Sequence, residues 1–405
     1  MRVHAGRLHR GDPTAKLTES RGTRHRVRIR AGAGRAAAIV LAAVLMLLTG
    51  VTAPANATVP GFQNVQNGNA WIDVNGDNRA DGCRVFASTV IMCTLSTGTG
   101  FGNTFAATGD LGYGAGRAWA DFNGDRAADY CRVVGAGYQN LQCTVSVFNN
   151  FGQTFTSGAV DPGYDAGRAW VDFNGDGKAD YCRVVGFSSK SAQCTVSGGD
   201  GWDDTFQSAS LDPGYDAGRS WVDANGDGKA DFCRIVGLWD KNVQCTFSTG
   251  TGFGRTVTSA ALDPGYDDSR RWGDVNGDGK ADYCRIVGNF SLSVRCTLST
   301  GNGFGNSFTS AAMDTGYGGT GAWADVNGDG KDDYCRDTGG NQGTCTLSNG
   351  SSFGTTFSGT GPGSQTRWAD FNADGKADFC QFITDAAIAC RVSLGTSFGA
   401  TFRNN

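Results

Sequence analysis

The chain has 405 residues, and its 35 Lys and Arg against 39 Asp and Glu give a formal charge of −4 at pH 7. This balance lacks the basic footprint that nucleic-acid binding requires, so the composition excludes nucleic acid as a partner. The 63 Gly favour a chain of many tight turns, and no segment keeps a helical period of hydrophobic residues.

The N-terminal region has the order of a secretion signal. Ten of the 35 basic residues lie in residues 1–35, an apolar run follows over 36–48, and Ala55-Asn56-Ala57 is a small-residue cleavage pattern. This order predicts a signal peptide over residues 1–57. Because the apolar run of about 13 residues is short for a bilayer, we expect no stable membrane insertion after cleavage. An uncleaved membrane anchor is the alternative.

Removal of this leader changes the chemistry of the remaining chain, residues 58–405. All three His and the single Glu, Glu19, lie in the leader. The loss of ten of the 35 bases and two of the 39 acids leaves a formal charge of about −12. Without His and Glu, the usual Ser–His triads, His bases and Glu-based glycosidase pairs are excluded.

A nine-residue acidic motif then recurs seven times. Its first copy reads Asp73-Val-Asn-Gly-Asp-Asn-Arg-Ala-Asp81, and every copy begins two residues after a Trp. Successive Trp are 48, 51, 51, 51, 51 and 45 residues apart, and a period of that kind indicates a repeat architecture. The Trp side chains, which we expect in the core or between repeats, are Trp71, Trp119, Trp170, Trp221, Trp272, Trp323 and Trp368.

Each repeat predicts four short antiparallel strands. In the third repeat, residues 169–172, 180–186, 192–197 and 205–208 are rich in β-formers and are separated by turn residues. Seven four-stranded units of about 50 residues favour an all-β fold, a seven-bladed β-propeller over residues 58–405. An open β-roll or solenoid is the alternative. For ring closure, the hypothesis is that the leader around Phe62 pairs with the last strand pattern, residues 399–403.

The 14 Cys divide into two per repeat, always 10 or 12 residues apart. An even count in an exported chain predicts disulfides, and a zinc site is disfavoured because two Cys without His cannot supply four ligands. Sequence alone does not fix the connectivity. One pair per repeat favours the local bridges Cys83–Cys93, Cys131–Cys143, Cys182–Cys194, Cys233–Cys245, Cys284–Cys296, Cys335–Cys345 and Cys380–Cys390.

The acidic motif places side-chain oxygens at positions 1, 3, 5 and 9, which matches the first part of a calcium loop. Bare, three carboxylates per loop would repel one another, so we expect calcium as a structural cofactor. The predicted ligands are Asp73, Asn75, Asp77, Asp81, Asp121, Asn123, Asp125, Asp129, Asp172, Asn174, Asp176, Asp180, Asp223, Asn225, Asp227, Asp231, Asp274, Asn276, Asp278, Asp282, Asp325, Asn327, Asp329, Asp333, Asp370, Asn372, Asp374 and Asp378. The alternative is a set of Asx-rich turns without metal.

The seven loops are unequal. Position 6 requires a sharp turn, which favours Gly, and five copies have Gly there. The first copy has Asn78, and the second has Arg126, which tolerates a positive φ poorly. We therefore expect the second loop to bind calcium most weakly. In the seventh loop, Ala373 replaces the usual Gly of position 4, a smaller departure.

The Trp-x-Asp-x-Asn-Gly-Asp-x-x-Ala-Asp runs, with a Phe-Gly pair later in most repeats such as Phe101-Gly102 and Phe253-Gly254, resemble the FG-GAP/VCBS repeat family. That family shares the propeller of integrin α-subunit heads. The third repeat departs with Trp202-Asp203, and the paired Cys are a further departure. The resemblance implies a seven-bladed propeller, calcium in the loop between the first two strands of each blade, and roles in adhesion or glycan binding.

Hairpin loops alternate between the two ends of a blade, so the tips between second and third strands lie opposite the acidic loops. The tips carry our candidate ligand-binding residues, Phe86, Tyr138, Phe187, Trp239 and Phe290, with Trp239 the best single candidate. The inter-blade loops at the same end carry two periodic series, in which an architectural role is favoured over glycan binding: Tyr113, Tyr164, Tyr215, Tyr266 and Tyr317, and Arg117, Arg168, Arg219 and Arg270.

These features predict a secreted, monomeric, calcium-stabilised binding module that recognises a glycan or a cell-surface protein without catalysis. A structural or adhesion protein that binds another protein is the first alternative. A calcium-dependent polysaccharide lyase or hydrolase is the second, because lyases can use calcium together with Lys, Arg or Tyr.

Overall fold

A computed structural model describes residues 62–64, 68–86, 89–317, 320–361, 363, 365–384 and 387–404. The predicted signal peptide at residues 1–57 lies outside this part of the chain. All described strands belong to one compact unit, Val51–Asn405. Within the described residues, no helix is long and apolar enough to cross a membrane.

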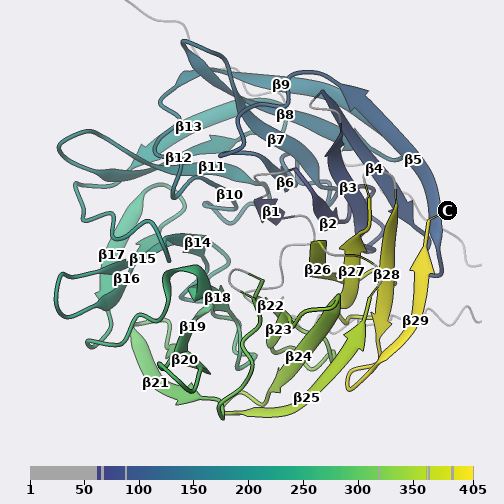
Figure 1. Ribbon diagram of the computed structural model, residues 1–405. Helices are drawn as coiled ribbons and strands as arrows, with labels where there is room; N and C mark the ends of the chain where they lie inside the picture. The colour runs from purple at the N-terminus through teal and green to yellow at the C-terminus, as the bar shows by residue number, and fades with distance from the viewer. Residues whose placement is uncertain are drawn as a thin grey trace, which may run out of the picture. The chain divides into compact units, whose positions relative to one another are not determined.

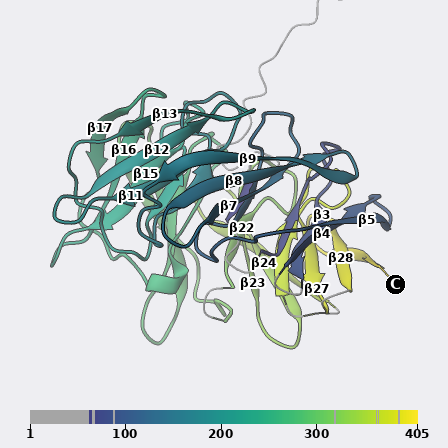
Figure 2. The ribbon, with the colours of Figure 1, turned by 90° about the horizontal axis from the view of Figure 1, so that it is seen from above.

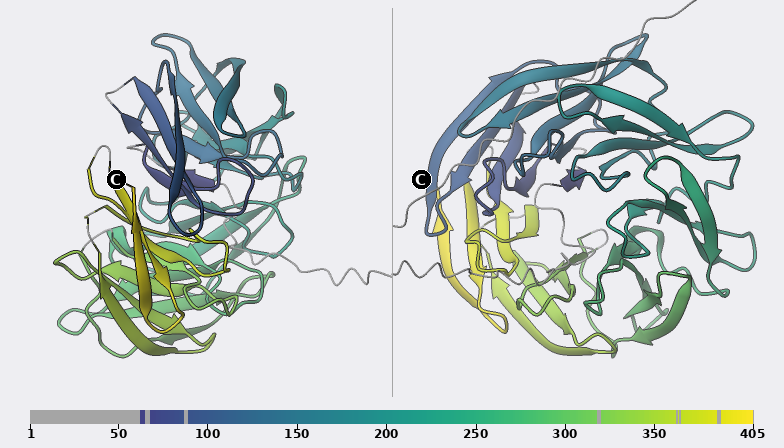
Figure 3. Two further views of the ribbon diagram at one scale, coloured as in Figure 1. Left: turned by 90° about the vertical axis from the view of Figure 1, so that its right-hand side faces the viewer. Right: turned by 180° about the vertical axis from the view of Figure 1, so that it is seen from behind.

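The strands form seven antiparallel sheets that follow one another around a ring in chain order, as Figure 1 shows and as the rear view of Figure 3 repeats. The alternation of β-formers and Gly-rich turns therefore gives the predicted seven-bladed propeller of four-stranded blades. The first strand of each blade faces the centre of the ring and the fourth lies at its outer edge (Figure 1).

The first three blades contain β2 (Ala70–Ile72), β3 (Asp81–Phe86), β4 (Val90–Ser96) and β5 (Phe101–Thr108); β6 (Ala118–Ala120), β7 (Asp129–Val134), β8 (Gln139–Val147) and β9 (Asn150–Val160); and β10 (Ala169–Val171), β11 (Asp180–Val185), β12 (Ser191–Ser197) and β13 (Trp202–Gln207). In the view from above, the long strands β8 and β9 run side by side across the second blade (Figure 2).

The other four contain β14 (Ser220–Val222), β15 (Asp231–Val236), β16 (Asn242–Ser248) and β17 (Phe253–Thr258); η1 (Asp267–Ser269), β18 (Arg271–Gly273), β19 (Asp282–Val287), β20 (Ser293–Ser299) and β21 (Phe304–Thr309); β22 (Ala322–Ala324), β23 (Asp333–Asp337), β24 (Gln342–Ser348) and β25 (Phe353–Thr360); and β26 (Gln365–Ala369), β27 (Asp378–Phe382), β28 (Ile388–Ser393) and β29 (Phe398–Arg403). Five of the fourth strands begin at the Phe of a Phe-Gly pair, and β9 begins one residue before it. In the third repeat the fourth strand begins at Trp202, earlier than the expected residue 205.

The ring-closing hypothesis is wrong. The leader strand β1 (Phe62–Asn64) pairs with β6, the innermost strand of the second blade, with Gln63 opposite Trp119. It adds a fifth strand on the central side of that blade, and the last strand, β29, pairs with β28 alone. Apart from β1, each blade is therefore built from one continuous segment, and no described strand is exchanged between the first and seventh blades.

The disulfides join directly opposed residues of the second and third strands. Cys182 faces Cys194 in the register of β11 and β12, and the same pairing recurs in all seven blades. All seven predicted bridges are confirmed, and no Cys is free. Disulfides in this number indicate a protein that folds in an oxidising compartment.

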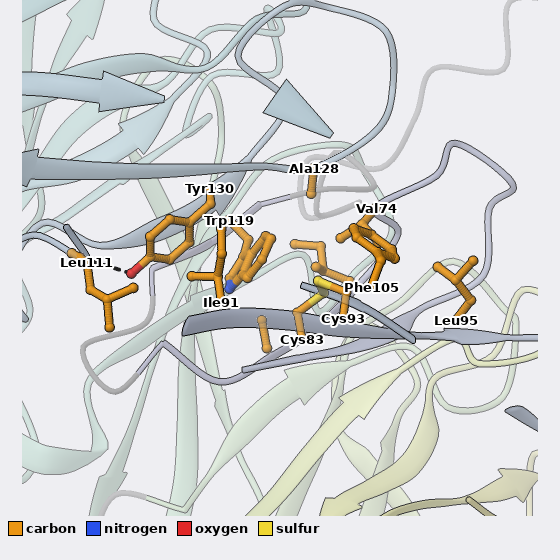
Figure 4. Packing of buried hydrophobic residues seen from close by; sticks show 12 residues of the cluster. Val74, Cys83, Ile91, Cys93, Leu95, Phe105, Leu111, Trp119, Ala128 and Tyr130 are labelled. Atoms are coloured by element: carbon orange, nitrogen blue, oxygen red, sulfur yellow. Dashed lines mark hydrogen bonds between the residues drawn. A yellow bond between two sulfur atoms is a disulfide. The ribbon is translucent and has the colours of Figure 1, made fainter. Parts of the chain in front are cut away.

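The hydrophobic core lies between blades as much as within them. In Figure 4, Trp119 and Tyr130 of the second blade pack against Ile91 and the Cys83–Cys93 bridge of the first. The equivalent Trp170 and Trp221 pack into the second and third blades in turn. The predicted core role of the Trp series is confirmed, because each Trp fastens its own blade to the preceding one.

The ring closes through side-chain packing and loop hydrogen bonds. Trp71 of the first blade packs 5.4 Å from Phe382 of the seventh, measured between ring centroids. The Ala80 amide donates to the Asp370 carbonyl at 2.7 Å, and the Ser96 hydroxyl donates to the Phe371 carbonyl at 2.7 Å. The bond from Ala80 to Asp370 recurs at every junction, and the bond from Ser96 recurs at most of them, for example from Ser197 to Phe122.

Candidate functional site

The acidic loops connect the first and second strands of every blade, as predicted. Their backbone turns twice through the left-handed region, at positions 4 and 6 of the motif. Gly occupies most of these positions, but Arg126 has φ of 72°, Asn78 of 64° and Ala373 of 60°. Because a side chain is strained at such φ values, these three residues indicate that the loop conformation is imposed by its hydrogen bonds.

Two carboxylates organise each loop by accepting backbone amides. In the third loop, Asp172 Oδ1 accepts from the Gly175 amide at 2.6 Å, and its Oδ2 accepts from the Gly177 amide at 2.8 Å. Asp180 Oδ2 accepts from the Phe173 amide at 2.9 Å, and its Oδ1 reaches the Ser197 amide at 2.8 Å. The ninth position thus ties the loop to the end of the third strand.

The ninth-position carboxylates are fully buried in all seven loops. Burial without a cation raises the pKa of Asp231 and Asp282 to about 8, and it raises those of Asp81, Asp129 and Asp180 well above the usual range. A buried carboxylate disfavours its charged form unless opposite charge is nearby. These positions are therefore where a bound cation would be most effective.

A basic residue at position 7 pairs with the fifth-position carboxylate of its own loop. Lys178 Nζ lies 2.7 Å from Asp176 Oδ2, and Arg79, Lys229, Lys280, Lys331 and Lys376 make the equivalent ion pairs. The second loop has Ala127 at this position. In six of the seven loops a Lys or Arg side chain therefore offsets part of the carboxylate repulsion from which calcium was predicted.

The donor set of each loop consists of carboxylate, amide and carbonyl oxygens, which suits calcium. In the part of the chain that the structure describes, however, no three His, Cys, Asp or Glu side chains gather as a metal site. Calcium would have to attract oxygens that now accept N–H groups and to compete with the position-7 base. The predicted ligands fit calcium by chemistry, and calcium binding stays a prediction.

The loops also form a continuous belt around the ring. In each junction the amide of position 8 donates to the position-1 carbonyl of the preceding blade, for example Ala179 to Asp121 at 2.7 Å. The closing member of the series is the bond from Ala80 to Asp370. Seven such bonds link all seven loops, which indicates that this end of the propeller is scaffold.

The opposite end exposes the predicted tip aromatics. Tyr138, Trp239 and Phe187 are 84%, 91% and 95% exposed, Phe290 is fully exposed, and Phe86 is 40% exposed. By contrast, Trp202 packs 5.0 Å from Phe122, measured between ring centroids, and so has a structural role. The tips are therefore the large aromatic side chains of this end that the fold does not use.

The periodic Arg series at the same end and four of the five periodic Tyr are architectural, as favoured. The Tyr164 hydroxyl donates to the Gly186 carbonyl at 2.9 Å, and Tyr113, Tyr215 and Tyr266 make the equivalent bond. Arg219 donates to the carbonyls of Ala166, Pro213 and Gly214, each at 2.8 Å, and so joins two successive inter-blade loops. We call Arg117, Arg168, Arg219 and Arg270 the brace arginines.

A second arginine series escaped the sequence analysis. Arg132, Arg183, Arg234, Arg285 and Arg336 follow the first Cys of their repeats and are buried. Arg183 donates to the Asp161 carbonyl at 2.8 Å and to the Thr195 hydroxyl at 2.8 Å, and desolvation lowers its pKa to about 10. The signal was present, because Arg follows Cys in six of the seven repeats.

No protein-family model matches the chain, so membership of the FG-GAP/VCBS family stays a prediction. The chain is 33% identical over 141 residues to the NAD(+)–arginine ADP-ribosyltransferase Chelt of Vibrio cholerae, a match that covers 34% of this chain and 23% of that protein.

Among solved structures, the chain resembles the Tc holotoxin pore of Photorhabdus luminescens, with a TM-score of 0.44 and 17% identity over 74% of this chain and 16% of that one. It also resembles the V. cholerae biofilm matrix protein Bap1, with a TM-score of 0.29 and 10% identity over 82% and 85% of the two chains. Likeness at these levels transfers no function.

Proposed function

We propose that the protein is a secreted, calcium-stabilised binding module of the FG-GAP/VCBS type that recognises carbohydrate at a cell surface through the tip end of its propeller. The observation that carries this proposal is the exposure of Tyr138, Phe187, Trp239 and Phe290, between 84% and 105%, on the end opposite the loop belt.

The tips differ from the periodic aromatic residues of the chain, with the exception of Tyr317, which is 64% exposed. Aromatic side chains that serve the fold are buried or hydrogen-bonded to backbone, as Trp170 and Tyr164 are. The tips lack such a role and vary between Phe, Tyr and Trp from blade to blade. Exposed rings on hairpin tips offer apolar faces for sugar rings, and a neighbouring polar group such as Asp240 beside Trp239 can bind hydroxyls.

Calcium has a structural role in this proposal. The side chains at positions 1, 3, 5 and 9 would hold it, with a backbone carbonyl at position 7. When bound, the ion supplies positive charge beside carboxylates whose pKa burial raises, such as Asp231 and Asp282. The loop belt then keeps the blades, and with them the tips, in a fixed arrangement.

A glycan array tests the recognition. The calcium-loaded protein is expected to bind a defined set of glycans, and Trp239→Ala is expected to reduce the signal at least about tenfold, the effect of about 1.4 kcal/mol. Phe148→Ala is the matched control, because Phe148 is 80% exposed in the turn between β8 and β9, at the loop end. Equal loss from both variants, or silence of the wild type, contradicts the proposal.

Calorimetry tests the calcium role separately. We expect the melting temperature to fall when a chelator replaces millimolar calcium, because extracellular loops of this kind bind at roughly 10⁻⁴–10⁻³ M. An unchanged melting temperature would show that the amide bonds and position-7 bases suffice for the loops. Cell-surface binding that persists without any glycan hit would instead indicate a protein partner.

A further inference from the structure

The junction between the fifth and sixth blades departs from the three preceding junctions at the tip end. In the preceding three junctions a brace arginine enters the space between inter-blade loops, and Arg219 and Arg270 each bond the previous loop's carbonyl at Ala166 and Ala217. At the equivalent place before Trp323, the chain has Gly321. A side chain added there would meet the Tyr334 hydroxyl at 2.8 Å. The brace is therefore absent from this junction.

A cavity of about 230 Å³ occupies this junction. Its wall includes Gly321 and the three rings of Tyr266, Tyr317 and Tyr334. At about 30 Å³ for each water molecule, the cavity holds the equivalent of about seven waters, which is room for one ring-sized polar molecule. A cavity thus accompanies the loss of the brace arginine side chain at this junction.

Two charged residues in the wall are also departures from the repeat. Asp268 stands where the earlier loops have Ala115, Ala166 and Ala217, and Arg271 stands where the earlier blades have Ala118, Ala169 and Ser220. Both line the cavity, and both act on the phenol of Tyr334, whose pKa burial raises to about 12. The second, third and fourth blades form without these charges, whereas the seventh blade has Arg367 at the position of Arg271.

Arg271 and Asp268 do not form an ion pair with each other. Arg271 Nη1 donates to the carbonyl of Arg270 at 2.8 Å, and no ion pair of the described residues includes Arg271 or Asp268. A guanidinium of this kind can bind a carboxylate through two parallel hydrogen bonds. Asp268, which is exposed, can accept hydrogen bonds from hydroxyl groups. The cavity thus offers a cation for one acidic group and a carboxylate for hydroxyls.

Tyr317 supplies an exposed ring at the same place. It is 64% exposed, whereas the other four members of its series are 41–45% exposed. The hydroxyls of those four each donate to a carbonyl of the adjacent hairpin. Within the described residues, the Tyr317 hydroxyl makes no equivalent hydrogen bond. Its ring face is therefore available to pack on a ligand at the mouth of the cavity.

From this junction we infer that the protein has a pocket for one acidic sugar residue, a pyranose that carries a carboxylate. Arg271 binds the carboxylate, Asp268 accepts hydroxyl hydrogen bonds, and the Tyr266 and Tyr317 rings pack on the sugar. The inference rests on the proposed carbohydrate recognition and assigns the ligand class to a site distinct from the Trp239 tip.

Isothermal titration of the full chain with methyl β-glucuronide tests the pocket. The wild type is expected to bind this probe at least about tenfold more tightly than methyl β-glucoside, which lacks the carboxylate and so loses one charge-assisted hydrogen bond. It is also expected to bind the probe at least about tenfold more tightly than acetate, which lacks the sugar ring. Arg271→Ala and Asp268→Ala should each weaken binding, Arg271→Ala by at least about tenfold. Both install the residue that other blades carry there, so both are expected to fold. Gly321→Arg should fill the pocket and abolish binding.

The outcomes separate this inference from the proposed function. Glucuronide binding that Arg271→Ala removes and Trp239→Ala leaves intact supports the pocket. Array binding that depends on Trp239, with no glucuronide binding by the wild type, overturns the pocket and leaves the tip proposal standing. Acetate that binds as tightly as the glucuronide overturns the sugar class, since it shows a simple anion site. Equal glucuronide affinity of the wild type and Gly321→Arg also overturns the pocket.

Discussion

The brace arginines provide a direct test of whether the periodic residues at the tip end serve the fold or a ligand. Arg219 is the clearest case, because its side chain is 5% exposed and donates to three carbonyls in two inter-blade loops. Its ion pair with Asp216 adds little, since the Asp216 side chain is 79% exposed. Arg219→Ala would leave all three carbonyls without this donor.

The expected cost follows from these bonds. A hydrogen bond to a charged group contributes about 1.5–3 kcal/mol, and water can replace some of the bonds at these half-buried carbonyls, so we expect Arg219→Ala to cost about 2–4 kcal/mol. Arg219→Lys keeps the charge but lacks the planar fork that reaches several acceptors, so we expect it to recover less than half of the loss.

Urea unfolding followed by Trp fluorescence measures this cost. Arg403→Ala is the matched control, because Arg403 is exposed on β29 and its loss should stay within about 0.5 kcal/mol. If Arg219→Ala changed the free energy of unfolding no more than this control but removed glycan binding, the architectural interpretation of the brace arginines would be refuted.

Three further predictions concern the scaffold. Replacing Cys233 and Cys245 by Ala should cost about 3 kcal/mol of unfolding free energy in urea, from the entropy of a loop of this length; a cost below about 1 kcal/mol would show that the bridge is redundant. In chelator, burial raises the pKa of Asp231, Asp282, Asp333 and Asp378 to about 8. Between about pH 4 and pH 8 the folded protein therefore holds protons that the unfolded chain has released. The free energy of unfolding should fall as the pH rises over this range. Calcium should flatten this slope, and a stability that rises over this range in chelator would contradict the burial argument. Ser96→Ala removes the 2.7 Å bond to the Phe371 carbonyl at the ring closure, and Ser197→Ala removes the equivalent bond to the Phe122 carbonyl. We expect each variant to lower the free energy of unfolding by the same amount, about 1–3 kcal/mol, because a carbonyl is left without its donor. A clearly larger effect of Ser96→Ala would show that the closing junction is weaker than the rest.

The repeat period made the fold predictable, because the same Trp, acidic loop and Cys pair recur in each unit. An even spacing within each Cys pair places both sulfurs on one face of adjacent strands, and the register of Cys182 opposite Cys194 agrees with that reasoning. The position of β1 was not predictable in the same way. A strand of three residues, Phe62–Asn64, has no pattern that distinguishes the edge of β6 from that of β29.

The candidate sites were predictable in part. The exposure of Trp239 and Phe187 followed from their place on polar hairpin tips. The ion pair between Lys178 and Asp176 could not be predicted in this way, because the net charge of a chain does not show which charged side chains are paired. The pocket at Gly321 is visible in the sequence only as an interruption of the brace series, and its meaning depends on the space that the missing side chain leaves.

The origin of the four main strands of each blade in one continuous segment has a consequence for how the chain matures. Every disulfide partner lies 10 or 12 residues from its mate, so the nearest thiol along the chain is always the native one. Blades can thus oxidise one after another as the polypeptide emerges, without waiting for distant segments, and loop closure over so short a distance is fast. Only the last event, the meeting of the first and seventh blades, depends on the whole chain.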